Sequence, residues 1–236
     1  MRSLLITAGP TQEPIDAVRY IANRSTGLMG IALAEAGSRR GFPVTLLLGP
    51  TTLSPRTQDG SSPTTHRFRT ASDLKRLLAT HWPHHDVLIM AAAVSDYRPV
   101  SSVPSGKLPH RNEPWRLELE PTPDLLAELA TTSRPDQTRI GFALEPDERL
   151  TASARRKLVD KNLAAIVANP LQTIASEHIT ATVLLCDGRT LTPPPPPPPP
   201  TPSTSAPESS SKHRFAEWLL DQLETICSAK PKADSC

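Results

Sequence analysis

The sequence predicts an α/β fold, a Rossmann-like open, mainly parallel sheet with helices on both faces. Short apolar runs alternate along the chain with segments of helical periodicity, an order typical of β-α-β units. The first apolar run enters a helix near residue 25 through a polar connection far longer than the usual connection of about two to six residues. Because parallel strands end at one edge of their sheet, we expect this connection to face a ligand crevice there.

The core elements follow from these patterns. Apolar runs predict strands at residues 3–7, 43–48, 66–69, 86–91, 139–143 and 164–168. Apolar residues at helical spacing, with Thr70 or Ser72 as one N-cap and Thr122 before Pro123 as another, predict helices at residues 27–40, 72–81, 124–131 and 146–161. Residues 1–192 are therefore predicted to form one nucleotide-binding domain.

Two segments depart from the alternation. Residues 97–121 lack a helical pattern and predict a mobile flap, followed by an extended strand near residues 115–119 that adds an antiparallel arm. Residues 180–192 predict a C-terminal hairpin that turns at Asp187-Gly188.

The C-terminal part is predicted to be modular. Residues 193–211 begin with eight consecutive prolines and predict a Pro/Ser/Thr-rich linker with a polyproline II spacer; a ligand for a partner domain is the alternative. Residues 212–228 predict an amphipathic helix that docks on the same domain, because their apolar side chains share one face. Residues 229–236 predict a disordered tail.

Composition narrows the function classes. The 236 residues carry a formal net charge of +2, which predicts no nucleic-acid partner, and no apolar run reaches the roughly 18 residues of a membrane span. Three widely spaced cysteines favour a reducing, cytoplasmic location over a disulfide framework. The histidines His81, His84 and His85 precede a predicted strand and are interpreted as a surface turn.

Small and polar residues follow four predicted strands at the crevice edge. The helix start at Ser25-Thr26-Gly27 offers N–H groups and hydroxyls to a phosphate, or is an ordinary N-cap. Asp96 after a run of alanines suits a ribose or a base, or caps a helix. Positions delivered by strand ends are Gly9, Thr11, Asp16, Arg19, Asn23, Ala91, Ala92, Ala93, Asp96, Phe142 and Asn169.

Other candidates have two interpretations each. Lys157 and Lys161 share a helix face, which is either solvated or turned to one ligand. Phe142 is a core residue or a stacking platform. Lys107 is a solvated loop residue or closes over phosphates as a point charge. No GxGxxG, GxxxxGK[ST], HExxH or GxSxG motif occurs, so the residues alone predict a nucleotide- or phosphate-binding enzyme without naming its reaction.

Residues 7–30, TAGPTQEPIDAVRYIANRSTGLMG, resemble the signature of bacterial phosphopantothenate–cysteine ligase, the ligase half of the bifunctional DNA/pantothenate metabolism flavoprotein. AAAVSDYRP at residues 91–99, GFALE at residues 141–145 and the lysines before Asn169 match in order and spacing, from residue 3 to about 192. The resemblance implies that CTP and Mg²⁺ activate the carboxylate of 4′-phosphopantothenate as an acyl-cytidylate. L-Cysteine then forms the amide and releases CMP.

The resemblance also implies partners. It implies a homodimer, and no flavin is expected in this chain. Because the chain begins at the ligase strand, we expect a stand-alone ligase served by a separate phosphopantothenoylcysteine decarboxylase. ATP could replace CTP. An NAD(P)-linked oxidoreductase and a non-catalytic scaffold that recruits partners through its prolines are the alternatives from other classes.

Roles are carried over residue by residue. Asn23 matches the residue that holds the acyl-nucleotide for attack by the amine, and Lys107 matches the flap lysine of the first half-reaction. Arg19 matches a phosphopantothenate or dimer contact, and Ser25, Thr26 and Gly27 are expected to bind substrate. Nucleotide contacts are implied at Gly9, Met90, Ala91, Ala92, Asp96, Lys107, Pro123, Asp124, Leu125, Leu126, Phe142, Lys157 and Lys161.

The sequence departs from the family pattern at several points. The flap around Lys107 carries fewer lysines than is usual, and Pro10 replaces the second glycine of TAGGT. The resemblance identifies no metal ligands.

Overall fold

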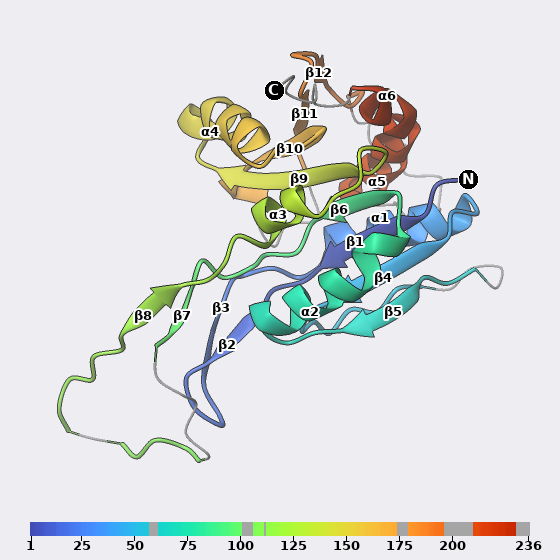
Figure 1. The fold of residues 1–236 in the computed structure, drawn as a ribbon. Helices are drawn as coiled ribbons and strands as arrows, with labels where there is room; N and C mark the ends of the chain where they lie inside the picture. The colour runs from blue at the N-terminus through green and yellow to red at the C-terminus, as the bar shows by residue number, and fades with distance from the viewer. Residues whose placement is uncertain (57–60, 101–105, 111, 174–178, 196–209, 230–236) are drawn as a thin grey trace, which may run out of the picture.

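A single eight-stranded sheet forms the centre of the molecule (Figure 1). The computed structural model describes residues 1–56, 61–100, 106–110, 112–173, 179–195 and 210–229. The strand order is β12-β11-β10-β9-β6-β1-β4-β5. Six neighbouring strands of this sheet run parallel, which confirms the predicted Rossmann-like α/β fold.

The parallel strands lie close to their predicted positions. All five residues of β1 are buried, which explains why this strand has no polar alternation. β5 begins two residues before its predicted start, and β9 extends two residues beyond its predicted end. The bounds are β1 Leu4–Ala8, β4 Val44–Leu48, β5 Thr64–Arg67, β6 Val87–Met90, β9 Thr138–Glu145 and β10 Ala165–Pro170.

The antiparallel hairpin at the sheet edge was predicted as well. β11 (Thr182–Leu185) pairs with β10 and with β12 (Thr190–Leu191). Gly188 takes a φ of +94° in the turn, a conformation that glycine adopts without strain.

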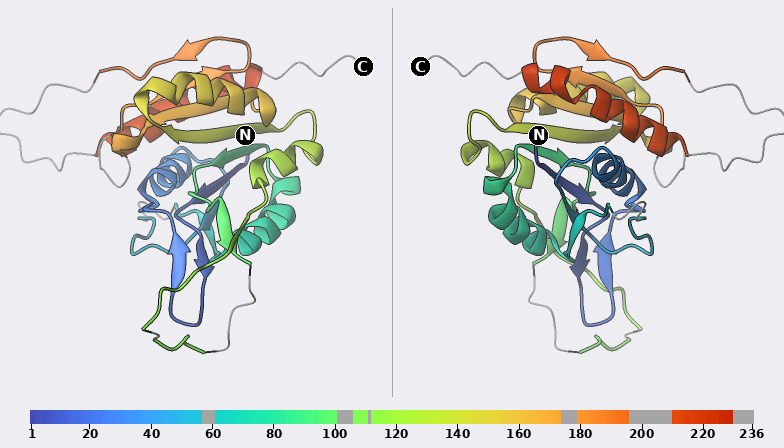
Figure 2. Two further views of the ribbon diagram at one scale, coloured as in Figure 1. Left: turned by 90° about the vertical axis from the view of Figure 1, so that its left-hand side faces the viewer. Right: turned by 90° about the vertical axis from the view of Figure 1, so that its right-hand side faces the viewer.

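Helices cover both faces of the sheet (Figure 2). Alternate residues of β1 point to opposite faces: Leu4, Ile6 and Ala8 join one core, and Leu5 joins the other. The first core is closed by α1 (Leu28–Arg39), α5 (Ser211–Asp221) and α6 (Leu223–Ser228). The second is closed by α2 (Ala71–His81), α3 (Leu125–Glu128) and α4 (Asp147–Asp160).

Helix α1 packs unusually close to the strand that precedes it. A Cβ atom added at Gly30 would lie 2.4 Å from Ala8 Cβ and 2.7 Å from the Thr7 oxygen. Only glycine fits this contact. It brings the N-terminus of α1 against the carboxyl end of β1, where the predicted crevice lies.

Two small hairpins form an arm that projects from the sheet (Figure 1). β2 (Gln12–Pro14) pairs with β3 (Tyr20–Ala22) inside the long polar connection, which the sequence did not predict as strand. β7 (Tyr97–Pro99) pairs with β8 (Leu119–Pro121), so the predicted antiparallel arm is present. Its second strand begins at Leu119, where the predicted strand of residues 115–119 ends.

Two predicted helices are interrupted. The helix predicted at residues 124–131 is one short α-helix continued by the 3₁₀ turn Leu129–Thr131. The terminal helix divides at Gln222, whose main-chain N–H donates to the carbonyls of Trp218 and Leu219. The division lets Leu223, Ile226 and Cys227 reach the same core as α5. Ala229 is also buried, while residues 230–236 and most of the predicted linker lie outside the described residues.

The histidines were predicted to form a surface turn; His84 is exposed in the 3₁₀ turn Trp82–His84, but His85 is not on the surface. His85 is buried between the carbonyl of His81, 2.7 Å from Nδ1, and Thr45 Oγ1, 2.9 Å from Nε2. Within the described ranges, no helix has both the length and the apolar character needed to cross a bilayer.

Candidate functional site

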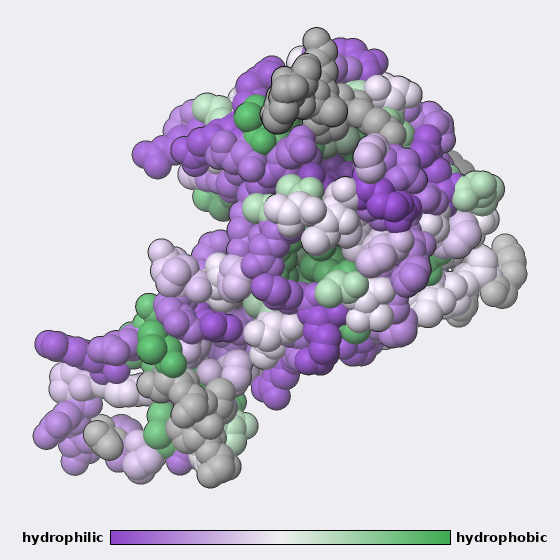
Figure 3. Space-filling view, viewed as in Figure 1, coloured by the Kyte–Doolittle hydropathy of each residue, from purple (hydrophilic) through white to green (hydrophobic). Residues whose placement is uncertain are grey.

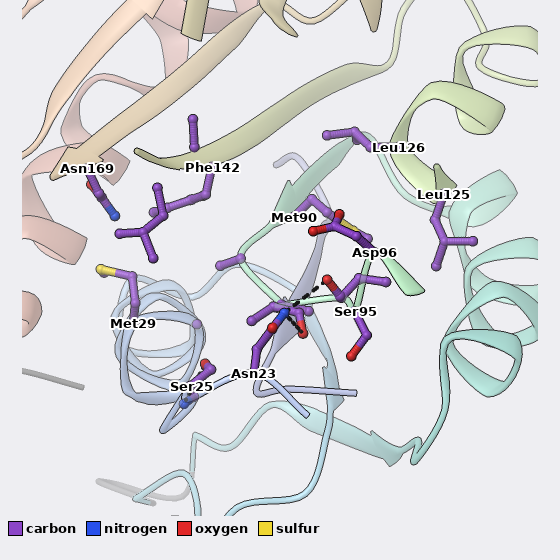
Figure 4. Close-up of a pocket in the computed structure, with 18 of the residues that line it drawn as sticks. Asn23, Ser25, Met29, Met90, Ser95, Asp96, Leu125, Leu126, Phe142 and Asn169 are labelled. Carbon is purple, nitrogen blue, oxygen red and sulfur yellow. Dashed lines mark hydrogen bonds between the residues drawn. The ribbon is translucent and has the colours of Figure 1, made fainter. Parts of the chain in front are cut away.

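The main cavity opens at the carboxyl ends of β1, β6, β9 and β10, as expected for a parallel sheet. Its volume is about 530 Å³. Figure 4 shows side chains from the loop after β1, from the loop after β6, from β9 and from β10 around one space. The lining comprises residues 23–30, 90–96, 122–126 and 142–144 with Lys157, Lys161, Asn169, Ile179 and Lys212.

Hydrogen bonds join the segments that follow β1 and β6. The Ala92 N–H donates to Thr7 Oγ1 at 3.0 Å, and the Ala93 N–H donates to the Gly9 oxygen at 2.9 Å. The Ser95 N–H donates to Thr11 Oγ1 at 3.0 Å. The small side chains of residues 91–93 therefore present a rigid backbone to a ligand.

Asn23 is held at the edge of this backbone. Its Nδ2 donates to the main-chain oxygens of Ala93 at 3.3 Å and Val94 at 3.1 Å. Carbonyl oxygens only accept, so these two contacts fix which end of the amide is nitrogen. The Asn23 Oδ1 atom remains an acceptor beside the cavity (Figure 4).

The N-terminus of α1 forms one wall. Gly27 has a φ of +78°, and Ser25 Oγ accepts from its N–H at 3.3 Å. The N-cap residue Gly27 supplies no side-chain cap, and among the described residues the Leu28 N–H makes only a long hydrogen bond, of 3.4 Å, to Thr26 Oγ1. Uncapped N–H groups at a helix start favour an anion, because they carry partial positive charge.

Another wall of the cavity includes Lys157, Lys161 and Asp124, and each lysine pairs with a carboxylate. Lys157 Nζ lies 2.6 Å from Glu145 Oε1, and Lys161 Nζ lies 2.8 Å from Asp124 Oδ2. The hydrogen bond from Lys157 holds the pKa of Glu145 below its ordinary value, against the opposing effect of burial. Burial raises the pKa of Asp124, but hydrogen bonds from Lys161 and from the Ala127 N–H outweigh it and lower the pKa overall.

A buried arginine holds this wall together. Arg139 donates to the carbonyl of Leu126 at 3.0 Å and to the carbonyls of Lys161 at 3.1 Å and Asn162 at 2.7 Å. Burial lowers the pKa of its guanidinium. Arg139 thus ties the end of α4 to α3, and it was not among the predicted site residues.

The structure brings most of the predicted site residues together. Asn23, Ser25, Thr26, Gly27, Asp96, Phe142, Lys157 and Lys161 all line the cavity, as do residues 90–92 and 123–126. Leu125 and Leu126 are also largely buried in the core beneath it. Gly9 lies beneath the cavity and approaches Gly27, with a φ of +83°.

Arg19 and Lys107 lie elsewhere. Arg19 pairs with the buried carboxylate of Asp16 and stacks on Trp115, with its guanidinium carbon 5.3 Å from the ring centroid. The Arg19 pairing is the chief cause of a strongly lowered Asp16 pKa. Leu108, the neighbour of Lys107, donates its N–H to Asp16 at 3.1 Å. Both predicted residues therefore belong to the arm and are absent from the lining of this chain's cavity.

Two further residues line the cavity: Asn169, which the sequence placed at the crevice edge without a role, and Lys212, which was not predicted. Asn169 Oδ1 is buried and has no hydrogen-bond partner among the described residues, and Lys212 is also buried. Asn169 follows a strand and could be identified from that position. Lys212 could not be identified in this way, because it lies in the terminal helix, which was predicted to dock on the domain but not to contribute to the site.

Comparisons with known proteins support a common family. Residues 1–194 match the DNA/pantothenate metabolism flavoprotein C-terminal domain. A Bacillus subtilis relative named coenzyme A biosynthesis bifunctional protein CoaBC is 38% identical over 172 residues, which cover 72% of this chain and 41% of the relative. A relative from an unknown prokaryotic organism, named cysteine/cysteine sulfinic acid decarboxylase, is 42% identical over 171 residues, which cover 72% of this chain and 46% of the relative.

Structural similarity extends over nearly the whole chain. The crystal structure of the C-terminal domain of a coenzyme A biosynthesis bifunctional protein CoaBC matches with a TM-score of 0.73 and 33% identity, covering 96% of each chain. This chain spans less than half the length of the two curated relatives above. With the family match over residues 1–194, these findings establish that the chain belongs to the DNA/pantothenate metabolism flavoprotein C-terminal domain family.

Proposed function

We propose that the chain is a phosphopantothenate–cysteine ligase that uses CTP. The observation that carries this proposal is the position of Asn23, fixed by the loop after β6 at a cavity that also holds an uncapped helix start and two lysines. A nucleotide and an acyl group could share this space. The CoaBC name of the relatives supports the same activity.

The proposed reaction has two steps. A carboxylate oxygen of 4′-phosphopantothenate attacks the α-phosphorus of CTP, and the bond to pyrophosphate breaks. The L-cysteine amine then attacks the acyl carbon of the resulting acyl-cytidylate; the amide forms, CMP leaves and the amine loses a proton. Asn23 Oδ1 is placed to accept a hydrogen bond from the attacking amine, which would orient its lone pair toward the acyl carbon.

The remaining lining residues have roles that suit a nucleotide. The N–H groups at the start of α1 would stabilise negative charge on phosphate, with the hydroxyls of Ser25 and Thr26. Phe142 and the backbone of residues 90–92 would contact the base and ribose. Lys157 and Lys161 pair with carboxylates and would add hydrogen-bond donors to the nucleotide.

A nucleotide-borne Mg²⁺ fits the acidic residues of the cavity. Mg²⁺ usually binds one or two carboxylates, substrate phosphates and water. Asp96 supplies a carboxylate in the cavity lining. It is not the partner of Lys157 or of Lys161, which pair with Glu145 and Asp124. No cluster of three or more potential ligands occurs within the residues described, which suits an ion carried by the substrate. When bound, Mg²⁺ would neutralise charge on the triphosphate.

We further propose a homodimer formed through the arm. Exposed apolar side chains gather on the projecting arm (Figure 3), and this kind of patch is typical of an interface. Arg19 and Lys107 lie on the same arm, and in the proposed dimer they would act at the partner's cavity. The exposed apolar residues are Val18, Tyr20, Tyr97, Val100, Trp115 and Leu119.

Stepwise product release tests the proposed activity. Purified protein with 4′-phosphopantothenate, CTP and Mg²⁺ should release pyrophosphate, whereas CMP and the amide should require L-cysteine as well. ATP in place of CTP measures nucleotide selectivity, and adding NAD(P) tests the oxidoreductase alternative. If neither CTP nor ATP gave pyrophosphate and amide, the proposed ligase activity would be contradicted.

A further inference from the structure

Lys212 is a buried cation at the cavity that the proposed mechanism leaves without a role. It lies in the first turn of α5 with 7% of its surface exposed, and it lines the cavity beside Ile179. Helix α5 packs against α1, whose N-terminus forms a wall of the same cavity. A lysine is almost never this buried unless it has a counter-charge.

The start of α5 is fixed from several directions. Ser211 Oγ accepts a hydrogen bond from the Ile179 N–H at 2.7 Å. His213, which follows Lys212, has its Nδ1 2.7 Å from Ser210 Oγ and its Nε2 3.3 Å from the buried carboxylate of Glu35 on α1. Farther along, Glu217 of α5 pairs with Arg39 and Arg40 at the end of α1. These contacts hold Lys212 in place independently of any contact of its own ammonium group.

Lys212 differs from the other lysines of the cavity. Lys157 and Lys161 each pair with a carboxylate, whereas Lys212 has no carboxylate or hydrogen-bond partner within the described part of the chain. Burial lowers the pKa of Lys212. A lysine side chain this buried usually has a counter-charge, and a ligand in the cavity that brings negative charge would supply it.

A second observation at the same cavity points to a missing ligand. Asn169 Oδ1 is buried without a hydrogen-bond partner among the described residues, although buried polar atoms are nearly always paired. Figure 4 places Asn169 near Met29 of α1, on the side of the cavity that the α1 N-terminus forms. On this side of the cavity, the protein alone therefore leaves a buried polar atom without a hydrogen-bond partner.

We propose that Lys212, with the N-terminus of α1, binds the phosphate chain of the nucleotide, so that the terminal helix completes the nucleotide site. The identity of the nucleotide rests on the proposed function, but the polyphosphate class follows from an unpartnered cation beside an uncapped helix start. Lys157 and Lys161, which already pair with Glu145 and Asp124, would then contact the other end of the same molecule.

Calorimetric titration of the full chain tests the assignment with three probes: CTP, inorganic tripolyphosphate and cytidine. Lys212→Gln should weaken CTP and tripolyphosphate by roughly 10- to 100-fold, the loss typical of a charge-assisted hydrogen bond, and leave cytidine binding unchanged. Lys212→Arg should retain most of the affinity. Lys75→Gln is the matched control, since Lys75 is exposed, pairs with Glu128 and is not part of the lining.

Thermal unfolding of the Lys212→Gln protein distinguishes a ligand-binding role of Lys212 from a structural one. Removing an unpaired buried charge should leave the melting temperature of the ligand-free Lys212→Gln protein unchanged or raise it, whereas a structural role would lower it. Equal weakening of CTP and cytidine, or unchanged binding of CTP and tripolyphosphate, would overturn the assignment even if the unmodified protein ligates cysteine. Lys212-dependent tripolyphosphate binding without ligation would support the phosphate site and contradict only the proposed activity.

Discussion

The Asn23 amide donates to the main-chain oxygen of Val94 at 3.1 Å and thereby fixes the segment between β3 and α1 to the loop after β6. A second bond from the same Nδ2 reaches Ala93 at 3.3 Å. Two strand ends far apart in the sequence are thus joined by one side chain at the cavity. The amide oxygen is left as the acceptor that the proposed amine attack requires.

Asn23→Ala should impair the second step more than the first. Loss of a positioned polar group that acts in the transition state costs on the order of 10²–10³-fold in rate. Pyrophosphate release with CTP and 4′-phosphopantothenate should therefore persist while amide formation falls by roughly that factor. Equal losses in the two assays would remove the role assigned to Asn23, and binding of CTP to the variant checks that its cavity is intact.

Subunit mixing tests whether Arg19 acts across a dimer. Arg19→Ala and Asn23→Ala should each form almost no amide alone, and a mixture that exchanges subunits should regain amide formation. In a mixed dimer, one cavity has its own Asn23 and the partner's intact arm. If the mixture stays as inactive as the separate variants although mixed dimers form, Arg19 does not act in the partner's cavity.

The Glu145–Lys157 pair should stabilise the fold in a pH-dependent way. The folded pKa of Glu145 lies below its ordinary value of 4.5, so the pair's contribution is fully present above pH 4.5 and is lost as the pH falls through the folded pKa. Because both side chains are partly exposed, Glu145→Gln should cost about 0.2–1 kcal/mol at neutral pH. Denaturant unfolding should show this difference shrinking in acid; a difference that is constant with pH would refute it.

Gly30→Ala should destabilise the protein through the contact between α1 and β1. The added methyl would lie 2.4 Å from Ala8 Cβ, and overpacking of this kind costs about 1–3 kcal/mol. Gly106→Ala is the control, because a Cβ at Gly106 meets no atom within 4 Å among the described residues. Urea unfolding of the two variants measures the difference, and equal midpoints would show that α1 adjusts without cost.

The regular fold could be predicted because its signals are local. β1 is a buried apolar run with a polar connection after it, and α2 has Thr70 as its N-cap, in a complete capping box with Asp73. Strand order beyond the alternation depends on long-range pairing. The β2–β3 hairpin was not predicted, because its strands are only three residues long and β2 (Gln12–Pro14) consists of residues typical of loops.

The site was predictable as far as strand ends define it. Asn23, Asp96 and Phe142 follow or end predicted strands and converge as expected. Lys212 could not be predicted in this way, because more than 40 residues separate it from Asn169 and only the packing of α5 on α1 brings it to the cavity. The position of Arg19 and Lys107 away from the cavity could not be predicted either, because the resemblance implies a residue's role but not the subunit in whose cavity it acts.

Isotope transfer from substrate to product tests the central claim most directly. 4′-Phosphopantothenate carrying ¹⁸O in its carboxylate would be turned over with CTP, Mg²⁺ and L-cysteine, and the released nucleotide analysed by mass spectrometry. Attack of the carboxylate on the α-phosphorus predicts CMP that carries one ¹⁸O atom and pyrophosphate that carries none. Unlabelled CMP, or label in orthophosphate released with CDP, would contradict an acyl-cytidylate and with it the proposed roles of the cavity residues.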